Sequence, residues 1–310
     1  MNRLVVLGSV NADHVLRVPH FPRPGETLTG HGYKIVPGGK GANQAVAAAR
    51  LGAAVSFIAR VGDDAIGRQM RDGFANDGID VSAVELDEQL PTGIAIIYVS
   101  DEGENSIGIS AEANGALSPA MVKNHETMIA AAHTLLLQLE VPLESVFEAA
   151  RLARAHGTRV VLNPAPARPL SDELLALVDL ITPNQTEAEL LTGIKVTDEA
   201  SAAKAAARFH QMGIAEVMIT LGSQGVYCSH HDRQILIPGF KVAAVDTTAA
   251  GDTFNGALLA AELAGADFSA AVRFAHGAAA LSVTRLGAQS SIPAKTEVDA
   301  FLQAHPAQGF

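Results

Sequence analysis

Short runs of Val, Ile and Leu alternate with longer Ala- and Leu-rich stretches along most of the chain. The short runs have the length of buried strands, and the longer stretches have the length and composition of crossover helices. The expected strands are residues 4–8, 55–61, 134–139, 159–163, 180–182 and 217–221, and the expected helices between them include 41–51, 143–156 and 199–212. This alternation predicts an α/β fold with a doubly wound, mostly parallel sheet flanked by helices.

Two stretches, residues 14–36 and 93–111, break the alternation because they contain strand-like runs separated by polar Gly/Pro turns, without a crossover helix. We expect them to form a small separate sheet, whose apolar faces a lid contact or a dimer contact would cover. Extra hairpins on the edge of the main sheet are the alternative. No internal repeat or linker-like Ser/Pro tract divides the chain, so we expect one α/β domain over residues 1–310 that carries this inserted β lid.

The composition is typical of a globular protein that acts on a small ligand. Hydrophobic residues make up 48% of the 310 positions and charged residues 18%, which provides a core and excludes disorder. The 22 basic and 33 acidic residues give a net charge of −11 without a Lys/Arg cluster, which argues against nucleic acid as a partner. An anionic ligand would therefore be held by metal ions, backbone amides and helix N-termini.

The sequence also indicates a compartment. No apolar run approaches the ~20 residues that a membrane span needs, and the apolar run at residues 4–8 is too short for a signal peptide. Cys228 is the single cysteine, which excludes an internal disulfide and every multi-cysteine zinc site. We therefore expect a cytoplasmic protein without a membrane partner.

The Gly-rich segment at residues 37–43 (PGGKGAN) leads directly into an expected helix. It is not a Walker loop, because Lys34 stands where that pattern needs a glycine and Gly41 stands where it needs Ser or Thr. Residues 8–11 also lack the second and third glycines of a dinucleotide fingerprint. The segment predicts either a tight turn or a turn at which a ligand approaches backbone amides, with Asn43 able to hydrogen-bond a hydroxylated ligand.

Polar side chains follow two of the expected strands. Asn11 and Asp13 come after the first strand, and Glu140 ends the strand-like run at 134–139. Open α/β folds bind their ligands at the carboxyl ends of parallel strands, so these residues are candidates for a ligand site. Turn formation at a strand end is the alternative for each of them.

Residues 184–187 (NQTE) lie between an expected strand and a helix. The spacing of Asn184 and Glu187 is that of a capping box, which is one interpretation. The other is that Glu187 orients magnesium-bound water while Asn184 faces a phosphate.

Residues 245–254 (VDTTAAGDTF) open an apolar helix over 255–263. Small residues before a helix leave several amides free, and these amides together with the helix dipole form an anion site without a cationic side chain. Asp252 in this first turn is placed to act as a carboxylate base beside that site. An ordinary acidic residue at a helix N-terminus is the alternative interpretation.

Taken together, residues 37–43, 184–187, 220–225 and 245–254 resemble the PfkB carbohydrate kinase family, and the similarity covers nearly the whole chain. The resemblance implies a doubly wound sheet with a small β lid. It further implies an enzyme that transfers the γ-phosphoryl group of ATP to the O5 hydroxyl of D-ribose, with Mg²⁺ and K⁺ as cofactors and a homodimer formed through the lid strands.

The resemblance also implies a role for individual positions. Asp252 would be the base, and the amides of Ala249, Ala250, Gly251 and Asp252 would form the anion hole. The sugar site would be lined by Asn11, Asp13, Gly39, Lys40, Asn43, Glu140 and Asp252. The nucleotide site would be lined by Asn184, Thr220, Gly222, Gly225, Gly251 and His276. Magnesium would involve Glu187. Potassium would be bound, several times through backbone carbonyls, by Asp246, Thr248, Ser282, Arg285, Gly287 and Ser291.

Several alternatives stay open at this point. One alternative within the family is that the acceptor is another sugar, such as deoxyribose or fructose, or a nucleoside. Two alternatives outside the family are a non-catalytic sugar-binding protein and a nicotinamide-dependent dehydrogenase. The missing dinucleotide fingerprint counts against the dehydrogenase. His276 is either a nucleotide contact or a histidine packed on a helix face, and Ala249 stands where many family members have glycine.

Overall fold

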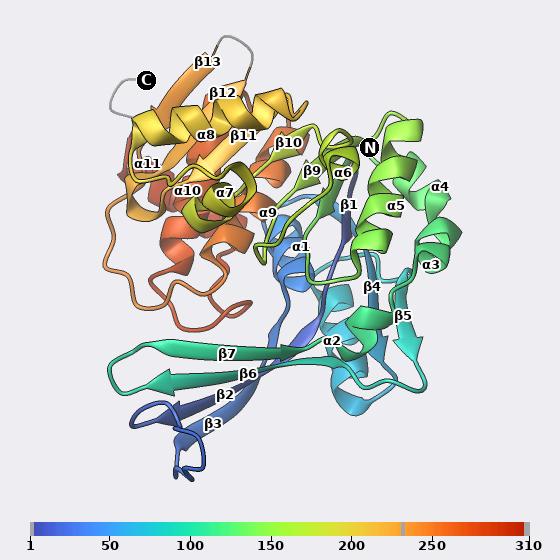
Figure 1. Ribbon diagram of the computed structural model, residues 1–310, viewed down its shortest axis with the longest axis vertical. Coiled ribbons are helices and arrows are strands. Elements are labelled where there is room, and N and C mark those ends of the chain that lie inside the picture. Colours follow the sequence, from blue (N-terminus) through green and yellow to red (C-terminus); the bar gives the residue numbers. More distant parts are fainter. Residues whose placement is uncertain (1–2, 231–232, 307–310) are drawn as a thin grey trace.

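The computed structural model describes residues 3–230 and 233–306, so both ends of the expected domain over 1–310 lie outside the described residues (Figure 1). The described strands form a nine-stranded main sheet. Its order is β13 (Arg233–Ile237), β12 (Val226–His230), β11 (Glu216–Thr220), β10 (Leu180–Ile181), β9 (Arg159–Leu162), β8 (Thr134–Leu137), β1 (Arg3–Leu7), β4 (Ala54–Gly62) and β5 (Val84–Asp87). All neighbours are parallel except at the β11–β12–β13 edge, which is antiparallel. The predicted α/β class is confirmed.

Helices cover both faces of this sheet. The sides alternate along β1, where Leu4 and Val6 join one core and Val5 and Leu7 join the other. The first core is completed by α1 (Lys40–Arg50), α2 (Ala65–Asn76), α9 (Ala250–Leu263), α10 (Phe268–Ser282) and α11 (Lys295–Ala304). The second is completed by α3 (Pro119–Asn124), α4 (Glu126–Ala130), α5 (Leu143–Ala155), α6 (Asp172–Leu175), α7 (Gln185–Thr192) and α8 (Glu199–Gln211). Strands buried on both faces explain the unbroken apolar runs of the sequence.

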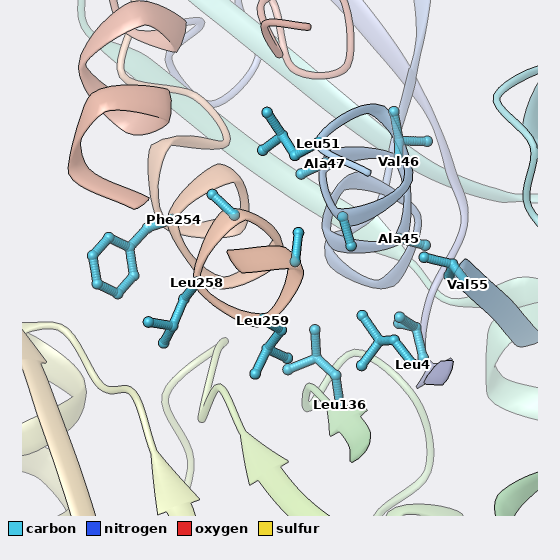
Figure 2. Close-up of a cluster of buried hydrophobic side chains, with 14 of the residues drawn as sticks. Leu4, Ala45, Val46, Ala47, Leu51, Val55, Leu136, Phe254, Leu258 and Leu259 are labelled. Carbon is cyan, nitrogen blue, oxygen red and sulfur yellow. The ribbon is translucent and has the colours of Figure 1, made fainter. Parts of the chain in front are cut away.

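Helices α1 and α9 lie against each other on the sheet, and Figure 2 shows Leu258 and Leu259 of α9 pointing toward the strands. Gly256 permits this close approach, because a Cβ added there would lie 2.6 Å from Cβ of Ala47 and 2.8 Å from the carbonyl oxygen of Gln44. The approach brings the N-terminal turns of α1 and α9 to the same edge of the sheet.

A second sheet has the order β3 (His31–Gly38), β2 (Asn11–Val18), β6 (Gly93–Ser100) and β7 (Asn105–Ser110). Strands β2 and β6 run parallel, and the other two pairs are antiparallel. These strands form their own sheet below the α/β body in Figure 1 instead of extending an edge of the main sheet. The 3₁₀ turn η1 (Glu112–Ala116) follows β7, and η2 (Gly222–Gln224) follows β11.

Among the described residues, no helix combines the length and the apolar composition that crossing a bilayer requires.

Candidate active site

The carboxylate of Asp252 is held by the N-terminal turns of two helices. Asp252 lies in the first turn of α9 and is only 7% exposed. Its Oδ2 accepts a hydrogen bond from Nδ2 of Asn43 over 3.0 Å, and its Oδ1 accepts one from Nε2 of Gln44 over 2.8 Å, both from α1. A buried carboxylate with two donors of this kind is kept in one orientation.

Backbone amides of the same turn are free to bind an anion. Ala249, the residue before α9, has left-handed backbone angles of φ 60° and ψ 14°, a conformation that favours glycine. The amide of Ala250 donates to the carbonyl of Thr247 over 3.2 Å, whereas those of Gly251 and Asp252 meet no acceptor in the described part of the chain. The turn thus offers two unused N–H groups at the positive end of the α9 dipole.

These groups open onto a cavity of about 190 Å³. The residues predicted from the sequence that line it are Lys40, Asn184, Glu187, Thr220, Ala249, Ala250, Gly251 and Asp252. Asn163, Thr182 and Asn255 also line it and were missed. Thr182 Oγ1 donates to Asn255 Oδ1 over 2.7 Å, and Asn255 Nδ2 donates to the carbonyl of Gly251 over 2.9 Å, which ties the head of α9 to the sheet. Asn163 and Thr182 each follow a buried strand, the same signal that indicated Glu140.

A single lysine lies among the acids of the site. Burial disfavours the charged form of Lys40, but the surrounding carboxylates outweigh it and raise the pKa of this ammonium. The carboxylates responsible are Asp252, Glu140, Glu187 and Asp13. Lys40 therefore stays charged and balances part of their negative charge.

Asp13 lies at the start of the small sheet and faces the same group of charges. Burial raises its pKa from 3.8 to about 7, and the nearby carboxylates Glu140 and Asp252 add to the rise. A Cβ added at Gly38 on the neighbouring strand would lie 2.1 Å from Asp13 Oδ2, so this glycine makes room for the carboxyl group. Asp13 also lines a hollow of about 410 Å³ between the small sheet and the α/β body.

The other residues of the expected sugar site are fixed around two short links, residues 8–10 between β1 and β2, and Gly39 between β3 and α1. Asn11 Oδ1 accepts from Nδ2 of Asn114 over 2.9 Å. Ser9 Oγ donates to Glu140 Oε2 over 2.5 Å, and this oxygen also accepts from the amide of Lys40 over 3.0 Å. Gly39, at φ 90°, leaves no space for a side chain, since its Cβ would lie 2.7 Å from the amide nitrogen of Asn11. Ser9 and Asn114 were not singled out in the sequence, because neither carries a chemical signature by itself.

The structure forms the capping box at α7, and it also places Glu187 in the cavity. Asn184 Oδ1 accepts from the amide of Glu187 over 2.8 Å, and Glu187 Oε2 accepts from the amide of Asn184 over 2.8 Å. Burial raises the pKa of Glu187, while the bond from Asn184 and the charge of Lys40 act in the opposite direction. The capping-box interpretation is thus confirmed, and Glu187 also lies where the magnesium interpretation needs a carboxylate, which stays a prediction.

His276 lies in a different hollow, of about 520 Å³, which it shares with Phe240, Arg273 and His305. Burial lowers its pKa to about 4, and its Nε2 has no hydrogen-bond partner among the described residues. Its ring packs edge-on against Phe254 of α9, with the ring centroids 5.4 Å apart. Gly222 is the first residue of η2, and Gly225 follows it. Gly225 abuts the backbone of residues 237–239, which lines the same hollow.

Comparison with known proteins places this geometry in a family. The sequence pattern of the pfkB family of carbohydrate kinases matches residues 1–295. The chain belongs to the PfkB family. It is 56% identical to a ribokinase of Haemophilus influenzae over 97% of this chain and 98% of that protein, and 44% identical to a ribokinase of Staphylococcus aureus over 96% and 99%.

Solved structures agree with this PfkB assignment. The structure of an Arabidopsis thaliana ribokinase complexed with ribose and ATP superposes with a TM-score of 0.92 at 33% identity, covering 98% of this chain and 99% of that one. The predicted membership of the PfkB family and the predicted doubly wound sheet with a small β-sheet are confirmed.

Among the six positions expected near potassium, this PfkB chain brings three into contact. Asp246 Oδ1 accepts from the amide of Thr248 over 2.9 Å, and its Oδ2 accepts from the amide of Gly287 over 2.8 Å. Burial opposes ionisation of Asp246, but these hydrogen bonds and the charge of Lys34 prevail and lower its pKa.

The side chains of the other three positions point to different partners. Arg285 forms an ion pair with Glu297 over 2.7 Å. The hydroxyls of Ser282 and Ser291 donate to backbone carbonyls three residues earlier, over 2.9 and 2.8 Å. Any contact of Ser282, Arg285 and Ser291 with a cation would therefore run through the backbone.

Proposed function

We propose that the chain is a ribokinase that transfers the γ-phosphoryl group of ATP to the O5 hydroxyl of D-ribose, giving ribose 5-phosphate and ADP. The observation that carries the proposal is the buried Asp252 carboxylate, which accepts from the side-chain amides of Asn43 and Gln44. Two backbone N–H groups of the same turn, which meet no acceptor among the described residues, face the same cavity. The identity to ribokinases over nearly the full length supports ribose as the acceptor.

The reaction forms a bond between O5 and the γ-phosphorus and breaks the bond between that phosphorus and the β,γ-bridging oxygen, which leaves with ADP. The O5 proton passes to Asp252. Because the transition state is loose and its charge lies on the transferred oxygens, Asp252 orients the hydroxyl early and takes the proton late. The amides of Gly251 and Asp252 then stabilise the charge that develops.

The sugar would be held on the side of the small sheet. Asn11, Asp13, Asn43 and Glu140 present amide and carboxyl groups that match sugar hydroxyls. Gly39 and Lys40 complete this side, where the glycine permits close approach and the lysine balances the carboxylates. Asn43 Oδ1 is buried and has no partner among the described residues, so it remains available to a sugar hydroxyl.

The nucleotide would lie along the opposite side. Asn184, Thr220 and Gly251 line the Asp252 cavity toward the phosphates. His276 lies in a separate hollow, and its Nε2 has no partner among the described residues. Gly225 abuts the backbone of residues 237–239, which lines that hollow, and Gly222 begins the same turn. Lys40, in reach of the same carboxylates, offers a positive charge to the transferred group.

Two cations belong to the proposal. Glu187 supplies a buried carboxylate on the phosphate side, a donor that suits Mg²⁺, and Mg²⁺ bound with ATP would neutralise phosphate charge there. K⁺ would be bound by a carboxylate and backbone carbonyls, oxygen donors that suit this ion, and would add positive charge beside the residues leading into α9. These donors would come from Asp246, Thr248, Ser282, Arg285, Gly287 and Ser291.

The small sheet is proposed to act as a lid and as a dimer contact. One face of it carries exposed apolar side chains, among them Ile35 and Ile96, at 44% and 45% exposure. Covering them with a second copy removes apolar surface from water. We also propose a cytoplasmic location, which is supported by the absence of a second cysteine from the sequence.

The test is an ADP-release assay with ATP and magnesium across D-ribose, 2-deoxyribose, fructose and a nucleoside, run in potassium and in sodium. The proposal expects ribose to give the highest kcat/KM and potassium to exceed sodium. A chain that prefers another acceptor contradicts the assignment to ribose. Equal rates in the two salts contradict the potassium site.

A further inference from the structure

Gln44 lies behind the Asp252 carboxylate, on the side away from the cavity. It is on α1, directly after Asn43, and is fully buried at 0% exposure. Its Nε2 donates to Asp252 Oδ1 over 2.8 Å and to Asn163 Oδ1 over 2.9 Å. We propose that Gln44 is a positioning residue that fixes the orientation of the Asp252 carboxylate during phosphoryl transfer. The inference rests on the proposed role of Asp252 as the base.

The direction of these hydrogen bonds is set by the backbone. A side-chain amide can be drawn in two orientations, so its neighbours must decide between them. Asn163 Nδ2 donates to the carbonyl of Thr182 over 3.0 Å, and a carbonyl only accepts. Asn163 therefore presents its oxygen to Gln44, which must in turn present its NH₂ group. That group then faces both Asn163 and Asp252.

A second glutamine closes the chain of bonds. Gln138 Nε2 donates to Gln44 Oε1 over 2.6 Å, so every polar atom of the Gln44 amide has a partner. Gln138 is itself confined by Gly8, where an added Cβ would lie 2.1 Å from Gln138 Oε1. The Gln44 side chain thus has one position and one orientation available.

Gln44 and Asn43 hold the same carboxylate but differ in what else they do. Asn43 Oδ1 is unpartnered in the described part of the chain, so Asn43 is able to contact the sugar. Gln44 has no polar atom left over and does not line the Asp252 cavity. Removing its amide should therefore change the rate of transfer and leave sugar affinity intact, because the carboxylate would be held at Oδ2 alone.

The experiment compares Gln44→Met with Thr158→Val in the full-length chain. Methionine keeps the length of glutamine and removes its donors. Thr158 is 3% exposed and donates to the Ile129 carbonyl over 2.9 Å just before β9, at the end of the sheet opposite Asp252, so its variant controls for loss of a buried hydrogen bond. We expect kcat to fall about 10²-fold in Gln44→Met with KM for ribose unchanged, and neither constant to change in Thr158→Val.

A second variant supplies a readout that a purely structural role would not move. In Gln44→Glu, a protonated carboxyl group restores one hydrogen bond to Asp252, whereas an ionised one repels it. The ratio of variant to wild-type kcat should therefore rise as the pH falls from 8 to 6. Three groups interact with the Asp252 carboxylate, namely Asp13 of β2, Lys40 of α1 and Glu187 of α7, and Glu140 after β8 interacts with Asp13 and Lys40. All four are present in both proteins, so their own titration is common to the two sides of the ratio.

The outcomes separate the two proposals. A folded Gln44→Met with wild-type kcat, or one that loses kcat and ribose affinity together, overturns the positioning role. If Gln44→Met does not fold, a pH-independent ratio for Gln44→Glu overturns it. A wild-type chain that phosphorylates a different sugar overturns only the ribose assignment, and the comparison is then made with that sugar. A chain that phosphorylates none overturns both.

Discussion

Asn43 and Asp252 are 209 positions apart in the sequence and are joined by a hydrogen bond of 3.0 Å. One belongs to the Gly-rich turn that opens α1, and the other to the small-residue turn that opens α9. The contact links the side proposed for the sugar to the side proposed for the phosphate, so the acceptor hydroxyl and the transferred group meet at one carboxylate.

Replacement of that carboxylate should abolish turnover and spare binding. Asp252→Asn keeps the size of the side chain but cannot accept the O5 proton, so we expect kcat to fall by roughly 10²- to 10⁴-fold. Ribose and ATP should still bind in calorimetry, and the melting temperature should fall modestly, because the NH₂ group of the asparagine meets one of the two donors that the carboxylate accepts from. Near-wild-type ADP release by this variant would show that Asp252 is not the base.

Asp13 should make the stability of the protein depend on pH. Its pKa is 3.8 when unperturbed and about 7 in the folded chain, so between these values the folded state binds more protons. The free energy of unfolding contributed by Asp13 therefore falls as the pH rises from about 4 to about 7. His276, lowered from 6.5 to about 4, contributes a slope of opposite sign below pH 6.5.

The measurement is urea unfolding of the wild type and Asp13→Asn at pH 5.0 and 7.5. Because His276 is common to both proteins, the difference between them isolates Asp13. We expect Asp13→Asn to gain stability relative to the wild type at pH 7.5 and to lose that advantage at pH 5.0. A difference that does not vary with pH would contradict the raised pKa.

Gly256→Ala should destabilise the contact between α1 and α9. The added Cβ would lie 2.6 Å from Ala47 Cβ and 2.7 Å from the amide nitrogen of Ala48, and overpacking of this kind costs roughly 1–3 kcal/mol. Gly73→Ala is the matched control, since Gly73 lies within α2 and an added Cβ there would have no neighbour inside 4 Å among the residues that the structure describes. The free energy of unfolding of Gly73→Ala should rise by up to about 1 kcal/mol, because alanine favours the helix more than glycine does. Chemical denaturation of both variants checks the pair, and equal changes would refute the packing argument.

Ile96→Glu should prevent association of two chains. Ile96 lies opposite His14 in the β2–β6 pair, and His14 lies opposite Ile35 in the β2–β3 pair, so the two isoleucines share one face of the small sheet. A charge there would have to be buried in the dimer. Light scattering should show a dimer for the wild type and for Phe147→Glu, an exposed position on α5, and a monomer for Ile96→Glu. A wild-type monomer would exclude the dimer.

The sequence predicts much of this fold because the relevant signals are local. Apolar runs predicted the main strands, the small-residue turn before α9 indicated Asp252, and a polar residue after a strand indicated Asn184. Gln44 escaped because an amide inside an apolar helix acquires its role only through Asn163 and Asp252, both more than 100 positions away. Asn163 follows β9 and carries the strand-end signal that indicated Glu140, so it was detectable and was missed. The separation of His276 from the Asp252 cavity was likewise invisible, since it depends on how α10 packs on α9.

The strands of the small sheet begin and end at residues of the candidate site. Asn11 is the first residue of β2, with Asp13 two positions on, and Gly38 is the last residue of β3, immediately before Gly39 and Lys40. A rotation of this sheet about its base would therefore change the separation between Asp13 and Asp252. Ligand binding and the angle of the small sheet are thus coupled. A neighbouring molecule that restrained the outer strands would change turnover without approaching the reacting atoms.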